Sequence, residues 1–160
     1  MDVYTVREAR IEEQRELTRL CVRATKHAGH DEAFIDRTMP ALTITVPMIN
    51  ANCVQVAQGS TSDFVGVVVV APTPLHGIAQ LHGLFVDPAH WKRGIGRVLF
   101  GAAVARAKGI RAGALMITAE PSAEGFYKRM GAIKIGEGPF YFSPETILPS
   151  LLYIIPREPS

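Results

Sequence analysis

The chain has 160 residues, of which 48% are hydrophobic and 20% are charged. This composition is typical of a packed globular protein and excludes a disordered or collagen-like chain, and the length fits a single domain over residues 1–160. The net charge of +2, from 17 basic and 15 acidic residues, is too even to favour nucleic acid or an anionic membrane as a partner.

The cysteines and the N-terminus bear on the cellular compartment. Cys21 and Cys53 lie far apart and belong to no CxxC or Cys/His spacing, so they indicate neither a disulfide framework nor a metal site. The first ten residues lack the apolar core of a signal peptide, and the longest apolar run, Val65 to Pro72, is too short to span a bilayer. We therefore expect a cytoplasmic protein without a bound metal.

Hydrophobic periodicity predicts strands and helices that alternate along the chain. Strands are expected at Val3–Val6, Asn52–Gln58, Phe64–Ala71, Ile78–Val86, Ala114–Thr118, Ala132–Ile135 and Leu151–Ile155. Helices are expected at Ile11–Ala28, Asp31–Met39, Ile95–Gly109 and Pro121–Met130. The stretch 41–50 gives no clear prediction, and 136–149 is expected to be a long connection.

Local signals set several of these boundaries. Asp31 is an acceptable N-cap for the second helix, and Pro40 disfavours its continuation. Gly131 can end the last helix in a left-handed conformation. The turn-prone residues 59–63 predict an antiparallel hairpin between the two strands that flank them. The order of elements predicts a mixed sheet with helices on both faces, an α/β fold, or α+β by stricter naming.

The most informative segment is LFVDPAHWKRGIGRVLF, where an apolar strand passes through a turn into a helix that starts with Gly94 and Gly96. The N–H groups at a helix start have no intrahelical partner, and glycine allows a pyrophosphate to approach the backbone closely. The side chains of Lys92, Arg93 and Arg97 add positive charge at the same point. The segment is therefore a candidate phosphate site.

The spacing of the glycines distinguishes between the known kinds of phosphate site. A dinucleotide fingerprint would require a third glycine where the chain has Leu99, and no Walker A pattern occurs. A tight strand-to-helix turn with solvated cations is the structural alternative, because GxG turns are common.

The segment WKRGIG resembles the acyl-CoA motif of the GNAT superfamily of N-acetyltransferases, in which Arg or Gln is followed by two residues, Gly, one residue, and Gly or Ala. The later segment PSAEGFYKRMGA resembles the second signature of that superfamily, and both fall in the family order. Trp91 stands at the Arg or Gln position, which is a departure. The resemblance implies a mixed, mostly antiparallel sheet of six to seven strands and transfer of an acetyl group from acetyl-CoA to an amine.

The resemblance also implies where acetyl-CoA binds. Main-chain groups of Leu84, Phe85 and Val86 are expected to hydrogen-bond the pantetheine arm, together with Ser122, which replaces an Asn of many relatives. Phe126 is expected beside the cofactor. The pyrophosphate is expected on the turn and helix start, at Lys92, Arg93, Gly94, Ile95, Gly96, Arg97 and Val98.

Tyr127 is the predicted catalytic acid. When an amine attacks a thioester, the departing sulfur gains negative charge, and a phenol beside it can donate a proton. Tyr127 follows Phe126 in the segment that resembles the acid-bearing helix of the family. A core aromatic is the alternative, because Phe126, Tyr127 and Met130 also form the apolar face of a short helix.

His82 is the predicted catalytic base. An aliphatic amine is almost fully protonated at pH 7, so a group must accept a proton, and histidine titrates near neutrality. By the two-residue period of a strand, Gln80, His82 and Leu84 are expected to share one face, and Gly83 suggests a bulge or a close backbone approach. A half-buried structural histidine and a water relay are the alternatives.

The acceptor pocket is expected to involve His27, His30, Phe34, Gln80 and Phe140, the last within the cluster of residues 140–142. Packing at the helix ends is the alternative for the histidines. The predicted function is acetylation of a primary amine on a small molecule, such as an amino acid or a polyamine. A catalytically idle acyl-CoA-binding regulatory domain and acetylation of a protein N-terminus or lysine are the alternatives. A homodimer through the last strands is what the resemblance implies.

Overall fold

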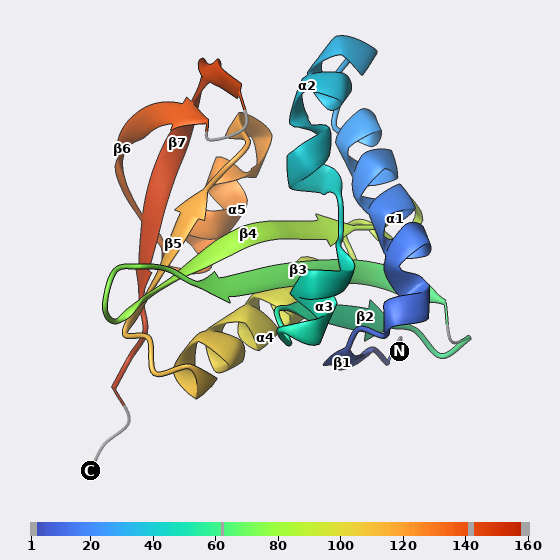
Figure 1. Ribbon diagram of the computed structural model, residues 1–160, viewed down its shortest axis with the longest axis horizontal. Coiled ribbons are helices and arrows are strands. Elements are labelled where there is room, and N and C mark those ends of the chain that lie inside the picture. Colours follow the sequence, from blue (N-terminus) through green and yellow to red (C-terminus); the bar gives the residue numbers. More distant parts are fainter. Residues whose placement is uncertain (1–2, 62, 141–142, 158–160) are drawn as a thin grey trace.

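A computed structural model of the protein describes residues 3–61, 63–140 and 143–157. A seven-stranded sheet of order β1-β2-β3-β4-β5-β7-β6 forms its centre (Figure 1). Only the β4–β5 pair is parallel, so the predicted mixed, mostly antiparallel sheet is confirmed. The strands are β1 (Thr5–Glu8), β2 (Val54–Gln58), β3 (Phe64–Pro72), β4 (Ile78–Val86), β5 (Ala114–Thr118), β6 (Ile133–Phe140) and β7 (Ser143–Ile154).

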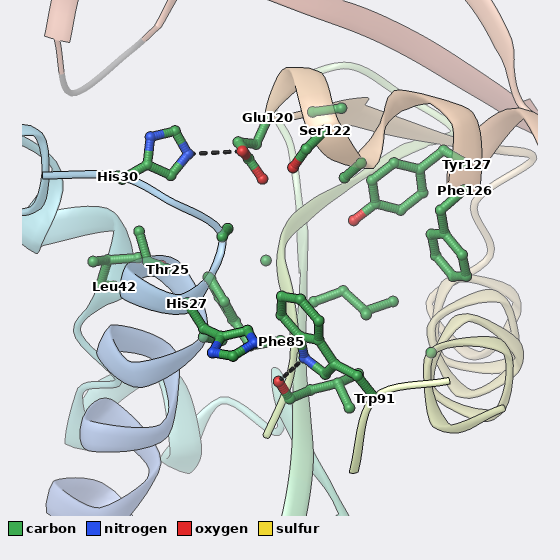
Figure 2. A pocket seen from close by; sticks show the side chains of 18 of the residues that line it. Thr25, His27, His30, Leu42, Phe85, Trp91, Glu120, Ser122, Phe126 and Tyr127 are labelled. Atoms are coloured by element: carbon green, nitrogen blue, oxygen red, sulfur yellow. Dashed lines mark hydrogen bonds and ion pairs between the residues drawn. The ribbon is translucent and has the colours of Figure 1, made fainter. Parts of the chain in front are cut away.

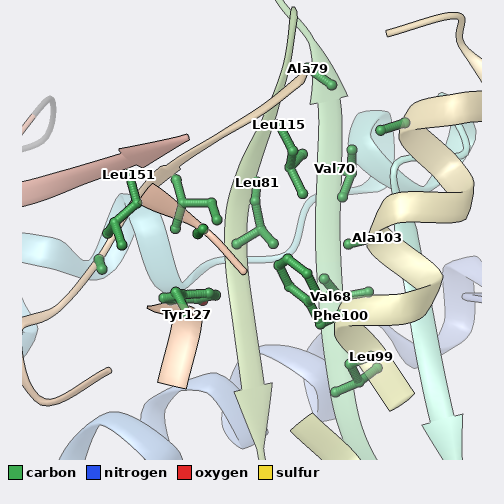
Figure 3. Close-up of a cluster of buried hydrophobic side chains, with 14 of the residues drawn as sticks. Val68, Val70, Ala79, Leu81, Leu99, Phe100, Ala103, Leu115, Tyr127 and Leu151 are labelled. Atoms are coloured by element: carbon green, nitrogen blue, oxygen red, sulfur yellow. The ribbon is translucent and has the colours of Figure 1, made fainter. Parts of the chain in front are cut away.

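Helices cover both faces of the sheet, as predicted. One face carries α1 (Gln14–His27), α2 (Glu32–Leu42) and α3 (Val46–Asn50), and the other carries α4 (Ile95–Gly109) and α5 (Glu124–Arg129) (Figure 1). Three short 3-10 turns, η1 (Ile11–Glu13), η2 (Pro88–His90) and η3 (Pro121–Ala123), precede α1, α4 and α5. Each face has its own hydrophobic core, and Figure 3 shows the core beside α4 and α5.

Helix α2 runs past the expected end at Met39. Its start is as predicted, since the carboxylate of Asp31 accepts a hydrogen bond from the Phe34 N–H at 2.8 Å. Pro40 lies in the last turn, where it removes only one hydrogen bond of the helix. Burial of the Leu42 side chain, which is 5% exposed, stabilises this turn. In the stretch without a clear prediction, the Thr45 side chain caps α3.

The long connection expected over residues 136–149 is wrong, because strands β6 and β7 occupy most of it. Pro139 lies on the edge strand of the sheet. Pro144 and Pro149 precede the part of β7 that pairs with β5, which is Ser150–Ile154. A strand with one neighbour tolerates proline because its nitrogen can face away from that neighbour.

The feature that positions the site is the divergence of β4 and β5. Their parallel pairing runs from Ile78–Ala114 to Leu81–Ile117, whereas β4 itself continues to Val86. Figure 1 shows β5, β7 and β6 running at a steep angle to β2, β3 and β4. The second half of β4 therefore keeps β3 on one side and opens on the other.

Gly66 on β3 lets helix α4 pack closely against the sheet. A Cβ atom there would lie 2.7 Å from Cδ1 of Leu99 and 3.0 Å from the carbonyl oxygen of Phe85. We predict that Gly66→Ala lowers the free energy of unfolding by about 1–3 kcal/mol through overpacking, as measured by chemical denaturation. Gly101→Ala is the control, because a Cβ on Gly101 meets no atom within 4 Å and should stabilise α4 by roughly 0.5–1 kcal/mol. Equal stability of the two variants would contradict the prediction.

Candidate active site

A cavity of about 800 Å³ lies where β4 and β5 diverge (Figure 2). Its walls come from α1 and α2, the end of β4, the start of α4, and the segment from β5 to α5. Gln80, Arg93 and Val98 do not line it, and Tyr141 and Phe142 lie outside the described residues. The predicted site residues that line it are His27, His30, Phe34, His82, Leu84, Phe85, Val86, Lys92, Gly94, Ile95, Gly96, Arg97, Ser122, Phe126, Tyr127 and Phe140.

The main chain of β4 faces the cavity at alternate residues. The Asp87 N–H donates to the Val65 carbonyl on β3 at 2.8 Å. In an antiparallel pair the hydrogen-bonding groups alternate in direction, so those of Phe85 also face β3 while those of Leu84 and Val86 face away from it. The structure therefore limits the expected main-chain contacts to Leu84 and Val86. Phe85 contributes its side chain to the cavity instead.

His82 forms a bulge in β4. The register with β3 passes from Val70–Leu81 to Val69–Gly83 and leaves His82 unpaired, which confirms the bulge expected from Gly83. The side chain is exposed toward the cavity that it lines. Withdrawal of part of the ring from bulk water lowers the pKa of His82 below its usual value. The imidazole is therefore neutral at pH 7 and can accept a proton.

The bulge also changes which side chains share a face. Leu81 before it and Leu84 after it both pack into the core beside α4, so Gln80 faces the other side of the sheet. The Gln80 amide donates to the Leu81 carbonyl at 3.2 Å. The expectation that Gln80, His82 and Leu84 share one face is wrong, because an inserted residue interrupts the two-residue period.

The start of α4 offers main-chain N–H groups to an anion. Gly94 is the N-cap, with a left-handed φ of +82°, and no side chain caps the helix. The first intrahelical hydrogen bond joins the Val98 N–H to the Gly94 carbonyl at 3.2 Å, so the N–H groups of the three preceding residues have no partner within the helix. A Cβ on Gly94 would meet no protein atom within 4 Å. This geometry, with Lys92 and Arg97 beside it, fits a phosphate group.

Trp91, which stands at the Arg or Gln position of the motif, binds the protein itself. Its indole N–H donates to the Val86 carbonyl at 2.8 Å, as Figure 2 shows. Its ring also meets the His27 ring edge to face, with 4.7 Å between the ring centroids. The turn is held to α1 by a further ion pair of 3.0 Å between Arg23 and Asp87. Trp91 therefore fixes the turn before α4 against β4 and α1.

Tyr127 belongs to both the core and the cavity. Its side chain is 5% exposed, and the ring packs in the core beside Phe100 (Figure 3) and beside Phe126. Figure 2 shows its hydroxyl group directed toward the cavity. Burial raises the pKa of Tyr127 well above its usual value, and the negative charge of Glu120 adds to this effect. The phenol therefore keeps its proton at neutral pH.

Glu120 is the cavity residue that the sequence analysis missed. Its carboxylate lies 2.7 Å from Nε2 of His30, whose ring stacks on Phe34 with 4.0 Å between centroids. This hydrogen bond joins the α1–α2 wall to the β5–α5 wall (Figure 2). A signal was present, because Glu120 follows the end of a strand, where ligand-binding residues of parallel strands gather. Helical residues Thr25, Thr38 and Leu42 also line the cavity and were not singled out.

The family comparison assigns the chain to the acyltransferases. The chain belongs to the acetyltransferase (GNAT) family, which matches residues 14–132. The predicted superfamily and enzyme class are thereby confirmed. Comparison with curated protein sequences gives no match.

Solved structures show the same fold. Nourseothricin acetyltransferase is 26% identical over 64% of this chain and 65% of its own length, with a TM-score of 0.58. The PaiA N-acetyltransferase from Thermoplasma acidophilum, solved in complex with coenzyme A, is 14% identical over 95% of this chain and 99% of its own, with a TM-score of 0.74. YncA from Salmonella typhimurium, solved with its cofactor acetyl-CoA, is 14% identical over 99% and 97%, with a TM-score of 0.69.

Two further features concern membranes and metals. Within residues 3–61, 63–140 and 143–157, no helix combines the length and the apolar character needed to cross a membrane. The same residues contain no group of three or more His, Cys, Asp or Glu side chains arranged to hold a metal ion.

We predict that Tyr127 keeps its proton at pH values where exposed tyrosines ionise, near pH 10. Ultraviolet difference titration should therefore give equal phenolate signals for the wild type and Tyr127→Phe up to about pH 11. Because the pKa in the folded state is above that in the unfolded state, the stability linked to this group is complete below about pH 10 and falls as the pH rises further. A smaller signal in Tyr127→Phe near pH 10 would contradict a buried phenol.

Proposed function

We propose that this protein is a cytoplasmic N-acetyltransferase that moves an acetyl group from acetyl-CoA to a primary amine of a small molecule, working as a single domain over residues 1–160. The observation that carries the proposal is convergence on one cavity. The open edge of β4, the uncapped start of α4 and the phenol of Tyr127 all reach it. The two cysteines are unpaired and buried, which suits a reducing compartment.

Residues along the cavity match the parts of acetyl-CoA. The main-chain groups of Leu84 and the N–H of Val86, with the Ser122 hydroxyl, are suited to hydrogen-bond the pantetheine arm. The helix start at Ile95–Arg97, with the Lys92 side chain, is suited to the pyrophosphate. The bound coenzyme A and acetyl-CoA of the PaiA and YncA structures support the same choice of cosubstrate.

The ammonium group must lose two protons, one before and one after its nitrogen attacks, and the sulfur must gain one. His82, directly or through water, accepts the first proton of the ammonium group, and the free amine then attacks the thioester carbonyl carbon. As the carbon–sulfur bond breaks, Tyr127 donates its proton to the leaving sulfur, and the resulting phenolate takes up the second proton of the attacking nitrogen, directly or through water. The products are an acetylated amine and the thiol of coenzyme A. The neutral state of His82 and the protonated state of Tyr127 at pH 7 support these roles.

A contact across the acceptor end favours a small molecule over a protein. The hydrogen bond between His30 and Glu120 joins the two walls of the cavity, whereas a polypeptide acceptor requires an open cleft. The proposed assembly is a homodimer. The exposed side chains of Ile133, Ile135 and Ile147 on β6 and β7 support it, because such apolar surface is typical of contacts between subunits.

The central experiment is a screen of amines with acetyl-CoA, read as free thiol. We predict that amines release thiol and that Tyr127→Phe lowers kcat by about 100-fold, the usual scale for a positioned acid, with little change in acetyl-CoA affinity or Tm. Tyr153→Phe is the matched control, because Tyr153 packs on Phe100 in the same core but does not line the cavity.

Normal turnover in Tyr127→Phe would mean that another group donates the proton to the leaving sulfur. Binding of acetyl-CoA without thiol release by any amine would favour the alternative of a regulatory domain.

The role of His82 predicts a change in the pH profile. His82→Gln should lower kcat/KM most near neutral pH, where the amine is protonated, and least near pH 10, where the free amine is abundant without help. The wild-type rate should also fall with acid through the lowered pKa of His82, and the variant should lose this step. His76→Gln, at an exposed turn, is the control. A His82→Gln profile parallel to that of the wild type would place the base elsewhere.

A further inference from the structure

The acceptor end of the cavity is the part walled by α1, α2 and the hairpin of β6 and β7. Its lining is largely apolar: Ala24, Ala28, Phe34, Ala41, Leu42, Phe140 and Leu148. The Thr25 and Thr38 hydroxyl groups also line it, but each donates to a main-chain carbonyl of its own helix at 2.8 Å. Apart from His27, His30 and Glu120, the surface offered to an acceptor is therefore apolar, because the hydroxyl protons of both threonines are already donated within their helices.

Charge is distributed unevenly along the cavity. The Lys and Arg residues that line it are Lys92 and Arg97, at the start of α4, and Arg129, at the end of α5. Among the described lining residues, α1 and α2 contribute no Lys or Arg, and Glu120 is the only carboxylate. An acceptor with its own carboxylate finds no Lys or Arg of α1 or α2 at this end. A polyamine would place a second charge against apolar side chains, which is unfavourable without a partner.

Glu120 is placed to meet a cation close to the site of acetyl transfer. Its side chain is 31% exposed and comes from the same segment as Ser122 and Tyr127, and Figure 2 shows the three directed toward the cavity. Its charge also acts on the Tyr127 phenol, so the two groups lie within electrostatic reach. His30 fixes one carboxylate oxygen, and a carboxylate can accept further hydrogen bonds from an ammonium group.

We infer that the acceptor is a primary amine with a single positive charge and an apolar body, and that Glu120 binds its ammonium group. This inference rests on the proposed function and narrows it, since it selects against the amino acids and polyamines considered from the sequence. Glu120 recruits the protonated amine, so its contribution lies in acceptor binding. The body of the acceptor lies against Phe34 and the small side chains of α1 and α2.

The test is calorimetric titration of amines into the protein saturated with coenzyme A, which allows binding without reaction. The reference probe is 2-phenylethylamine. L-phenylalanine adds a carboxylate to it, 2-phenylethanol replaces its ammonium group by a hydroxyl, and spermidine replaces its aromatic body by a chain with further charges. We predict that 2-phenylethylamine binds at least about tenfold more tightly than the other three, the scale of one charge-assisted hydrogen bond.

Glu120→Gln should weaken the binding of 2-phenylethylamine by about tenfold or more and leave the binding of 2-phenylethanol unchanged. Glu124→Gln is the matched control, because Glu124 pairs with Lys128 and does not line the cavity. The inference is overturned if L-phenylalanine or spermidine binds best, if no probe binds, or if Glu120→Gln binds 2-phenylethylamine as the wild type does.

Failure of the proposed function has a different signature. If 2-phenylethylamine binds as predicted but no amine releases thiol from acetyl-CoA, the acceptor site stands and the catalytic proposal is wrong. If spermidine or an amino acid turns over while 2-phenylethylamine binds weakly, the catalytic proposal stands and the acceptor class is wrong.

Discussion

The early end of the β4–β5 pairing is the constraint on which the rest of the site depends. Four residue pairs join these strands, and beyond Leu81 and Ile117 the strands separate. Main-chain groups within a protein require hydrogen-bond partners, so the free edge of β4 calls for a ligand or for side chains of the protein. Trp91 supplies one partner, at the Val86 carbonyl. The start of α4, the bulge at His82 and the phenol of Tyr127 all lie around this opening.

Stability and chemistry share residues at the opening. The Tyr127 ring is part of the core beside α4 and α5, so the rigidity of that core fixes the direction of its hydroxyl group. A Cβ on Gly96 would lie 3.3 Å from the Phe126 ring, which shows that the first turn of α4 and helix α5 are packed tightly. The phosphate end and the phenol are therefore held at a fixed spacing by one continuous set of contacts.

Patterns local in the sequence predicted much of the fold, and the errors have physical causes. The bounds of β4, α4 and β5 were predicted correctly because uniform apolar runs end at Pro or Gly. The prediction for β6 and β7 was wrong because of their prolines. A strand tolerates proline where the proline nitrogen faces a side without a neighbouring strand, and the local sequence does not show which side that is. Gln80 was misplaced by the bulge at His82. Glu120 was missed because its partner, His30, is 90 residues away in sequence.

The two cores lie behind different walls of the cavity. The acceptor wall at residues 24–42 is built on the core of α1, α2 and α3, whereas Tyr127 and the start of α4 belong to the other core. Changes on the cavity side of α1 and α2 therefore alter one core and leave the other intact. Such a division makes the cavity modular: under the proposed function, substitutions within one short N-terminal stretch can reshape part of the acceptor wall while the start of α4, Tyr127 and Glu120 stay as they are.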